Sequence, residues 1–202
     1  MKVKICGVTR LEDALFAEQA GVDALGFIFV PHSKRRVSAE QVAEICDALG
    51  PFISRVGVFQ NATLEHIREV AEEAKLDTIQ LHGDEDEVFA KALGRSFKII
   101  KAISFSAKLE LKALKAFPAD AILLDGIKPG SGETFDWSEA AFLQALPHLI
   151  LAGGLNPANV EAGIASLKPY AVDAASGVEI SPGIKDPDKV LDFIHKAKAS
   201  EI

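Results

Sequence analysis

The feature that most constrains the fold of this chain is the regular return of short runs rich in β-branched and other apolar residues. Eight such runs follow one another at intervals of about 25 residues, which is enough for a strand and a helix. They cover residues 3–8, 24–29, 54–59, 78–82, 98–103, 121–125, 149–152 and 171–175. Eight strand–helix units favour a parallel sheet that closes into an α/β barrel of the (β/α)8 or TIM type, with its helices outside.

The stretches between these runs carry the start signals of amphipathic helices. In a capping box, a side chain at the helix start accepts a hydrogen bond from a backbone N–H group of the first turn. Three pairs of residues have this spacing: Thr9 with Glu12, Ser38 with Gln41, and Asp136 with Glu139. Two further helices are expected where Asn or Asp precedes a proline of the first turn, at Asn156-Pro157 and Asp186-Pro187.

The chain shows no internal boundary. No linker or low-complexity tract divides it, so we expect residues 1–202 to form a single domain, a barrel that is compact beside the usual size of about 250 residues. The nearest alternative is an open, doubly wound sheet. Such sheets carry a glycine-rich nucleotide-binding turn after the first strand, and the chain lacks that pattern after residues 3–8.

The net charge and the cysteine content limit which binding partners and which cellular location are expected. The net charge of −7 argues against nucleic acid, because contacts to phosphates need a concentrated basic surface. No apolar run approaches the roughly 20 residues of a membrane helix and no secretion signal is evident, so we expect no membrane partner and a cytoplasmic location. Cys6 and Cys46 are too few for a disulfide framework, and no metal-ligand spacing is present.

Several polar residues lie within the predicted strands, where side chains alternate between two faces. If Cys6 points into the barrel at the end of its strand, Lys4 points the same way one layer below. Gln80, Lys101 and Asp173 are further candidates for the interior. A lone buried charge is costly. We therefore expect a structural network that consists of Lys4, Gln80, Lys101 and Asp173.

Two glycine-bearing turns follow the seventh and eighth predicted strands, at Gly153-Gly154 and at Ser176-Gly177. Glycine lets the backbone approach a ligand closely, and N–H groups at helix starts favour anions. In barrel proteins these two loops commonly hold a phosphate, so we expect a phosphate site here. A third glycine-rich loop, residues 126–134, has the length and composition of a lid over the site, although a plain connection would have the same composition.

The thiol of Cys6 and the carboxyl of Asp125 lie at or near the ends of two predicted strands, at the barrel face where active sites lie. Cys6 can be a packing residue or a reactive thiol, and the nearby Lys4 is expected to lower its pKa. Asp125 can cap a loop, join an ion pair, or act as a general acid if its surroundings hold its proton.

Arg35 and His82 complete the set of candidates. Arg35 lies in the basic loop 31–36 of an acidic chain, which indicates an anionic substrate, and a guanidinium can hold a carboxylate with two parallel hydrogen bonds. His82 can bind a ligand, act as an acid or base, or be a hydrogen-bonded structural residue, which is the interpretation we prefer. A thiol, a carboxylic acid, an arginine and a phosphate site together suit proton transfer on a small, doubly anionic molecule.

Six segments stand out as motifs along essentially the whole chain. They are Lys4-Ile5-Cys6-Gly7-Val8-Thr9, Gly26-Phe27-Ile28-Phe29 with Ser33-Lys34-Arg35, Gln80-Leu81-His82-Gly83, Phe135-Asp136-Trp137, Gly153-Gly154-Leu155-Asn156-Pro157 and Ser176-Gly177-Val178-Glu179. In this order and combination they resemble the phosphoribosylanthranilate isomerase family. Each segment alone is a weak signal, and the set is highly specific.

The resemblance implies an Amadori rearrangement in tryptophan biosynthesis, without cofactor or metal. N-(5-phosphoribosyl)anthranilate becomes 1-(o-carboxyphenylamino)-1-deoxyribulose 5-phosphate, with Asp125 as the general acid that opens the ring and Cys6 as the general base that removes the C2′ proton. The implied substrate-binding residues are Arg35 for the anthranilate carboxylate, His82, and Gly153, Gly154, Ser176 and Gly177 for the phosphate. The partner would be this phosphorylated small molecule, and the chain would be a monomer or a homodimer.

Two other hypotheses stay open on the sequence alone. The first is a different phosphate-binding barrel enzyme: a sugar-phosphate epimerase needs clustered metal ligands at strand ends, and an indole-glycerol-phosphate synthase needs a lysine and glutamates placed for ring closure. The second is a protein that binds a phosphorylated ligand without catalysis. Cys6 and Asp125 argue against this second hypothesis, because binding alone requires neither residue.

Overall fold

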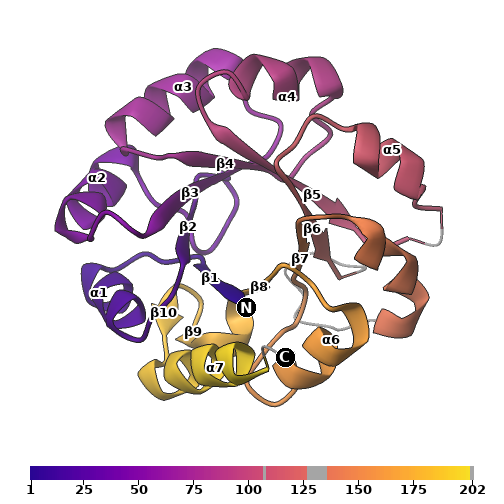
Figure 1. Cartoon of the computed structure of the whole chain (residues 1–202). Helices are drawn as coiled ribbons and strands as arrows, with labels where there is room; N and C mark the ends of the chain where they lie inside the picture. The colour runs from indigo at the N-terminus through magenta and orange to yellow at the C-terminus, as the bar shows by residue number, and fades with distance from the viewer. Residues whose placement is uncertain (107, 127–135, 201–202) are drawn as a thin grey trace.

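The computed structural model of the chain describes residues 1–106, 108–126 and 136–200. Eight parallel strands form a closed barrel in chain order, with β8 paired to β1 (Figure 1). The strands are β1 (Lys2–Cys6), β2 (Ala24–Ile28), β3 (Ser54–Phe59), β4 (Thr78–Leu81), β5 (Lys98–Ser104), β6 (Ala121–Asp125), β7 (Leu149–Leu151) and β8 (Ala171–Ala174). Each predicted run matches one strand to within two residues at either end, so the predicted (β/α)8 barrel is confirmed.

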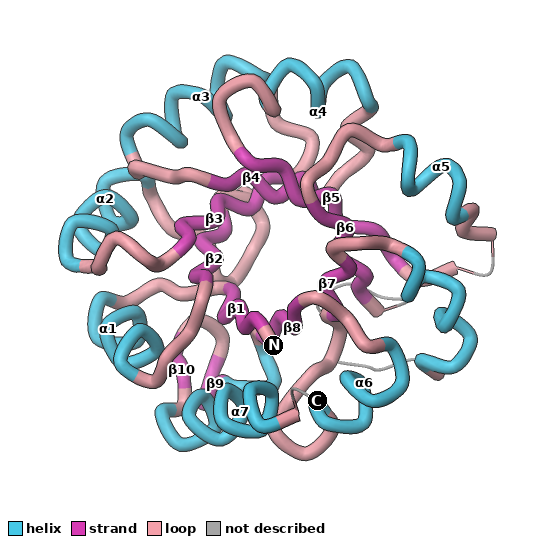
Figure 2. The backbone as a smooth tube through the Cα atoms, viewed as in Figure 1, coloured by secondary structure: helices cyan, strands magenta, loops and turns pink. Residues whose placement is uncertain are grey.

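Helices form an outer ring around the strands (Figure 2). They are α1 (Leu11–Gln19), α2 (Ala39–Ala48), α3 (Leu64–Glu73), α4 (Glu87–Leu93), α5 (Leu111–Ala116), the 3-10 helix η1 (Trp137–Ala145), α6 (Val160–Leu167) and α7 (Pro187–Ala199). Between β8 and α7 lie a short 3-10 helix, η2 (Ser176–Val178), and an antiparallel hairpin of β9 (Glu179–Ser181) and β10 (Ile184–Lys185), which were not expected from the sequence. None of the described helices is long and apolar enough to cross a membrane.

Three of the predicted helix starts are occupied by the expected side chains. Ser38 and Gln41 make both hydrogen bonds of a capping box at α2. Asp186 accepts hydrogen bonds from backbone N–H groups of the first turn of α7, and Pro187 is the first residue of that helix. Asp136 accepts a hydrogen bond from a first-turn N–H group of η1. These three helix starts could be predicted from the sequence because each depends only on residues that are close in sequence.

Two predicted helix starts were wrong, and both side chains stabilise turns instead. Thr9 does not cap α1, because its hydroxyl donates a 2.6 Å hydrogen bond to the carbonyl oxygen of Gly183 in the β9–β10 hairpin. Asn156 accepts a hydrogen bond from the backbone N–H of Ala158 at 2.8 Å, and Asn159 is the residue that precedes α6. The helix therefore starts after an extra turn.

A small apolar cluster fills the barrel interior, distinct from the larger core between strands and helices. Its buried members are Val56, Ile100, Ala102, Leu123, Ile150, Ala152 and Ala171. Since Ile100 and Ala102 face the interior, Lys101 between them faces outward. Its ammonium donates to the carbonyl oxygen of Gly83 at 2.5 Å and to Glu85 at 3.0 Å. The prediction that Lys101 joins an interior network was wrong.

The interior polar network is smaller than expected and centres on one ion pair. Lys4 and Asp173 lie opposite each other on β1 and β8, and Nζ of the lysine is 2.9 Å from Oδ2 of the aspartate. Both side chains are buried. Gln80 is also buried, and its Nε2 lies 3.2 Å from Nδ1 of His82 rather than on the ion pair. Pairing thus compensates the buried charges of Lys4 and Asp173.

Candidate active site

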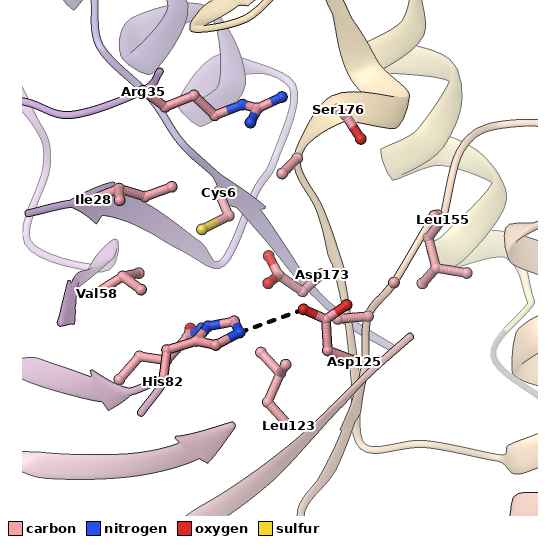
Figure 3. Close-up of a pocket in the computed structure, with 15 residues that line it drawn as sticks. Cys6, Ile28, Arg35, Val58, His82, Leu123, Asp125, Leu155, Asp173 and Ser176 are labelled. Carbon is pink, nitrogen blue, oxygen red and sulfur yellow. Dashed lines mark hydrogen bonds and ion pairs between the residues drawn. The ribbon is translucent and has the colours of Figure 1, made fainter. Parts of the chain in front are cut away.

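A cavity opens at the C-terminal ends of the strands (Figure 3). Seven of the eight residues predicted for the site line it: Cys6, Arg35, His82, Asp125, Gly153, Gly154 and Ser176. Gly177 is the exception, because it lines a neighbouring depression with Asn156 and Pro157. A Cβ atom at Gly177 would lie 2.0 Å from the carbonyl oxygen of Leu155, so glycine lets the turn after β8 pack against the turn after β7.

Cys6 is the last residue of β1, and its side chain lines the cavity (Figure 3). It lies opposite Gly26 of β2, where a Cβ atom would be 2.7 Å from the sulfur, so this glycine leaves room for the thiol. Burial raises the pKa of the Cys6 thiol above its usual value, and the ammonium groups of Lys4 and Lys185 oppose this only in part. The expected effect of Lys4 has the right direction, and the expectation of a lowered pKa was wrong because burial outweighs it.

Asp125 ends β6 on the opposite wall of the cavity and faces His82 (Figure 3). Its Oδ1 accepts a 2.7 Å hydrogen bond from the backbone N–H of Gly126. Its Oδ2 lies 3.4 Å from Nε2 of His82, while Nδ1 of the same ring lies 3.2 Å from Gln80. The imidazole is therefore held between an amide and the carboxyl, which orients both His82 and Asp125.

The turn after β7 has a backbone that only glycine adopts readily. Gly153 and Gly154 have φ angles of +79° and +69°, and a Cβ atom at Gly153 would lie 2.2 Å from the backbone nitrogen of Gly126. Asn159 holds the turn by donating from Nδ2 to the carbonyl oxygen of Gly154 at 3.0 Å. The main chain is thereby exposed to the cavity without side chains in between. Apart from Gly126, the predicted lid at 126–134 lies outside the described residues.

Arg35 reaches the cavity from the loop after β2, and its guanidinium is already paired on one edge. Its Nε and Nη2 donate to the two carboxylate oxygens of Glu179 at 2.8 and 2.7 Å. Side-chain hydrogen bonds from Arg35 and the charge of Lys185 hold the pKa of the Glu179 carboxyl below its usual value, against the opposing effect of burial. Arg35 therefore faces a permanent internal anion as well as the cavity.

Glu179 and Lys185 contact the cavity-lining residues Arg35 and Cys6, and sequence reasoning assigned no role to either of them. Both belong to the β9–β10 hairpin, and the signal for it was present: apolar and polar residues alternate on either side of Ser181-Pro182-Gly183. Asp173 was expected to be only structural, yet it also lines the cavity. Its Oδ1 is buried and accepts no hydrogen bond from the part of the chain that the structure describes.

Metal ligands do not gather anywhere in the described ranges: no group of three or more His, Cys, Asp or Glu side chains there is placed to hold an ion. A closed (β/α)8 barrel with a thiol, a carboxyl, an arginine and glycine turns around one C-terminal cavity places the chain in the class of TIM barrels with a site at the C-terminal face. The sequence model of the N-(5′phosphoribosyl)anthranilate (PRA) isomerase family matches residues 3–196. The chain belongs to this family, which confirms the resemblance seen in the sequence.

Individual relatives agree over the full length. The N-(5′-phosphoribosyl)anthranilate isomerase of Thermotoga neapolitana is 46% identical over 202 residues, which is 98% of each chain. The crystal structure of phosphoribosyl anthranilate isomerase from Thermus thermophilus is 45% identical, with a TM-score of 0.93 over 98% of this chain and 99% of that one. A phosphoribosyl anthranilate isomerase solved in complex with reduced 1-(o-carboxyphenylamino)-1-deoxyribulose 5-phosphate is 42% identical, with a TM-score of 0.90 and the same coverage.

Proposed function

We propose that the cavity catalyses the Amadori rearrangement of N-(5-phosphoribosyl)anthranilate to 1-(o-carboxyphenylamino)-1-deoxyribulose 5-phosphate, a step of tryptophan biosynthesis. The observation that carries this proposal is that Cys6 and Asp125, from β1 and β6, line one cavity beside a glycine turn (Figure 3). The relative solved with the reduced product supports the choice of substrate. We expect a cytoplasmic protein, monomeric or homodimeric, whose partner is this phosphorylated small molecule.

In the first step of the proposed reaction, Asp125 acts as the general acid. It gives a proton to the ring oxygen of the sugar, the bond between C1′ and that oxygen breaks, and the electron pair goes to the oxygen. The nitrogen lone pair then forms the C=N bond of a protonated Schiff base. The fixed position of the Asp125 carboxyl, between Gly126 and His82, supports this role because general-acid catalysis needs a proton donor at a defined place.

In the second step, Cys6 acts as the general base. Its thiolate takes the C2′ proton, the electrons of that bond form a C1′=C2′ double bond, and the C=N electrons return to nitrogen to give an enolamine. The enolamine becomes the ketone when C1′ gains a proton and the 2′-hydroxyl loses one. Because burial holds the pKa of Cys6 above its usual value, the reactive thiolate is a minor species at neutral pH, and its fraction grows as the pH rises.

Two anion sites hold the phosphate and the carboxylate of the substrate, so that its sugar lies beside the acid and the base. The glycine turn at Gly153-Gly154, together with Ser176, takes the phosphate through backbone N–H groups, and Arg35 takes the anthranilate carboxylate. The proposal is supported because Arg35, Gly153, Gly154 and Ser176 all line the cavity that contains Cys6. Figure 3 shows Arg35 and Ser176 at the same side of this cavity. Fixing both ends of a small molecule before reaction can account for a large part of a rate enhancement.

The proposal is tested by following the fluorescence loss of N-(5-phosphoribosyl)anthranilate with Cys6→Ser and Asp125→Asn. Each substitution is expected to reduce turnover by about 10²- to 10⁴-fold, the usual contribution of one proton-transfer group, while the fold is retained. Cys46→Ser is the matched control, because this second cysteine is buried in α2 outside the barrel. A near-wild-type rate for either site variant would remove its assigned role.

A further inference from the structure

The β9–β10 hairpin brings a buried carboxylate to the edge of the cavity, and the proposed reaction does not use that carboxylate. Glu179 is 8% exposed. Besides the hydrogen bonds from Nε and Nη2 of Arg35, it accepts hydrogen bonds from Nζ of Lys185 at 2.9 Å and from the backbone N–H of Gly183 at 3.2 Å. Its charge is thus compensated by two cations and fixed by the hairpin's own main chain.

Lys185 ties the hairpin to the two strands that border the site. Its buried ammonium donates to the carbonyl oxygen of Cys6 at 2.6 Å and to that of Ala175 at 3.3 Å, in addition to Glu179. These carbonyls belong to the last residue of β1 and to the residue that follows β8. One lysine therefore locks Glu179 to the main chain that carries the thiol and to the chain leading into Ser176.

Arg35 is held on two sides. Gly7 has a φ angle of +73°, and a Cβ atom there would lie 2.5 Å from Cδ of Arg35, so the stem of the arginine packs directly on the glycine. Glu179 occupies the guanidinium edge formed by Nε and Nη2. A guanidinium has five N–H donors, and Nη1 has no hydrogen-bond acceptor in the described part of the chain. One edge of the group is thereby left for a second carboxylate.

We propose that Glu179 is a positioning residue for carboxylate recognition: with Lys185 behind it, it holds the guanidinium of Arg35 so that the Nη1 edge faces the cavity. This inference rests on the proposed function, in which Arg35 binds the anthranilate carboxylate. A purely structural role explains the pair less well, because a buried ion pair is often no more stabilising than well-packed apolar residues. A held guanidinium, in contrast, loses less conformational freedom when the substrate binds.

The test is a comparison of kcat and KM for two substrates in Glu179→Gln, Arg35→Met and the double variant. The substrates are N-(5-phosphoribosyl)anthranilate and the analogue without the carboxylate, N-(5-phosphoribosyl)aniline. Glu179→Gln is expected to raise KM for the natural substrate by about tenfold to a hundredfold, with a much smaller change in kcat. It is expected to leave KM for the analogue unchanged, and to add little in the Arg35→Met background.

Asp77→Asn is the matched control, because Asp77 accepts from Arg55 at the other end of the barrel, directly before β4. Unchanged KM in Arg35→Met would refute the carboxylate site itself. Raised KM in Arg35→Met with unchanged KM in Glu179→Gln would overturn only the role of Glu179. If Glu179→Gln does not fold, Glu179→Asp keeps the charge and withdraws it by one methylene; an unchanged KM for the natural substrate in that variant would also overturn the proposal.

Discussion

Gly26→Ala tests whether the place of the Cys6 sulfur is set by the strand beside it. In the structure, a Cβ atom at residue 26 would lie 2.7 Å from the sulfur and 3.1 Å from Cα of Cys6. Ordinary contacts begin at 3.4 Å, so the sulfur must move by about 0.7 Å or the two strands must separate. Because one of the crowded atoms is the main-chain Cα of Cys6, the clash cannot be relieved by a change of side-chain rotamer alone.

The expected cost has two parts that separate assays can resolve. Overpacking of this kind lowers the free energy of unfolding by about 1–3 kcal/mol, which urea unfolding measures. A displacement of the proposed base by somewhat less than 1 Å is expected to lower kcat/KM by one to two orders of magnitude, which the fluorescence assay measures at a temperature where the variant is fully folded.

Gly57→Ala is the control for this experiment. A Cβ atom at residue 57 of β3 would lie 2.4 Å from a methyl group of Leu76 and 2.8 Å from the ring of Phe59, so it overpacks the barrel without touching the cavity. Its stability is expected to fall in the same range, with kcat/KM preserved. The reasoning would be refuted if Gly26→Ala kept wild-type kcat/KM, or if both variants lost activity in proportion to their loss of stability.

Two further predictions concern charge and local structure. Lys4→Gln removes a cation that lowers the pKa of Cys6, so that pKa rises further and the acid limb of the pH profile of kcat/KM moves to higher pH. The sign follows from the requirement for thiolate, whose fraction falls as the pH drops below the pKa; a limb that stays in place would argue against Cys6 as the base. Ser38→Ala removes the cap of α2 and is expected to lower the free energy of unfolding by about 1 kcal/mol in urea, with kcat unchanged.

The barrel was predictable because its determinants are short-range and repeated. Each apolar run is bordered by turn or cap residues. A run such as residues 121–125 predicts a strand without any knowledge of the strands that pair with it. The positions of Cys6 and Asp125 beside the cavity could be predicted because both residues lie at strand ends. The position of the Gly153-Gly154 turn beside the cavity could be predicted because it follows the seventh strand.

Several of the wrong or missing predictions depend on the assembled barrel, and two of them depend on a partner far away in the chain. The partner of Arg35 is Glu179, and that of Thr9 is Gly183 on a hairpin that pairs only with itself. The side chain of Lys101 points outward, toward Glu85. Side chains alternate between the two faces of a strand, so an error of one residue in the expected phase reverses the face that Lys101 occupies. The sign of the pKa shift of Cys6 follows from burial inside the finished barrel, and the sequence indicated only the neighbouring lysine.

The most direct test of the central claim is the kinetic isotope effect on kcat/KM with substrate deuterated at C2′. If Asp125 opens the ring and Cys6 then takes the C2′ proton, Cys6→Ser makes the second step limiting and shows a large primary isotope effect. Asp125→Asn makes ring opening limiting and shows an effect near unity. The reverse pattern, or no isotope effect in Cys6→Ser, would contradict the roles assigned to these two groups that line the cavity (Figure 3).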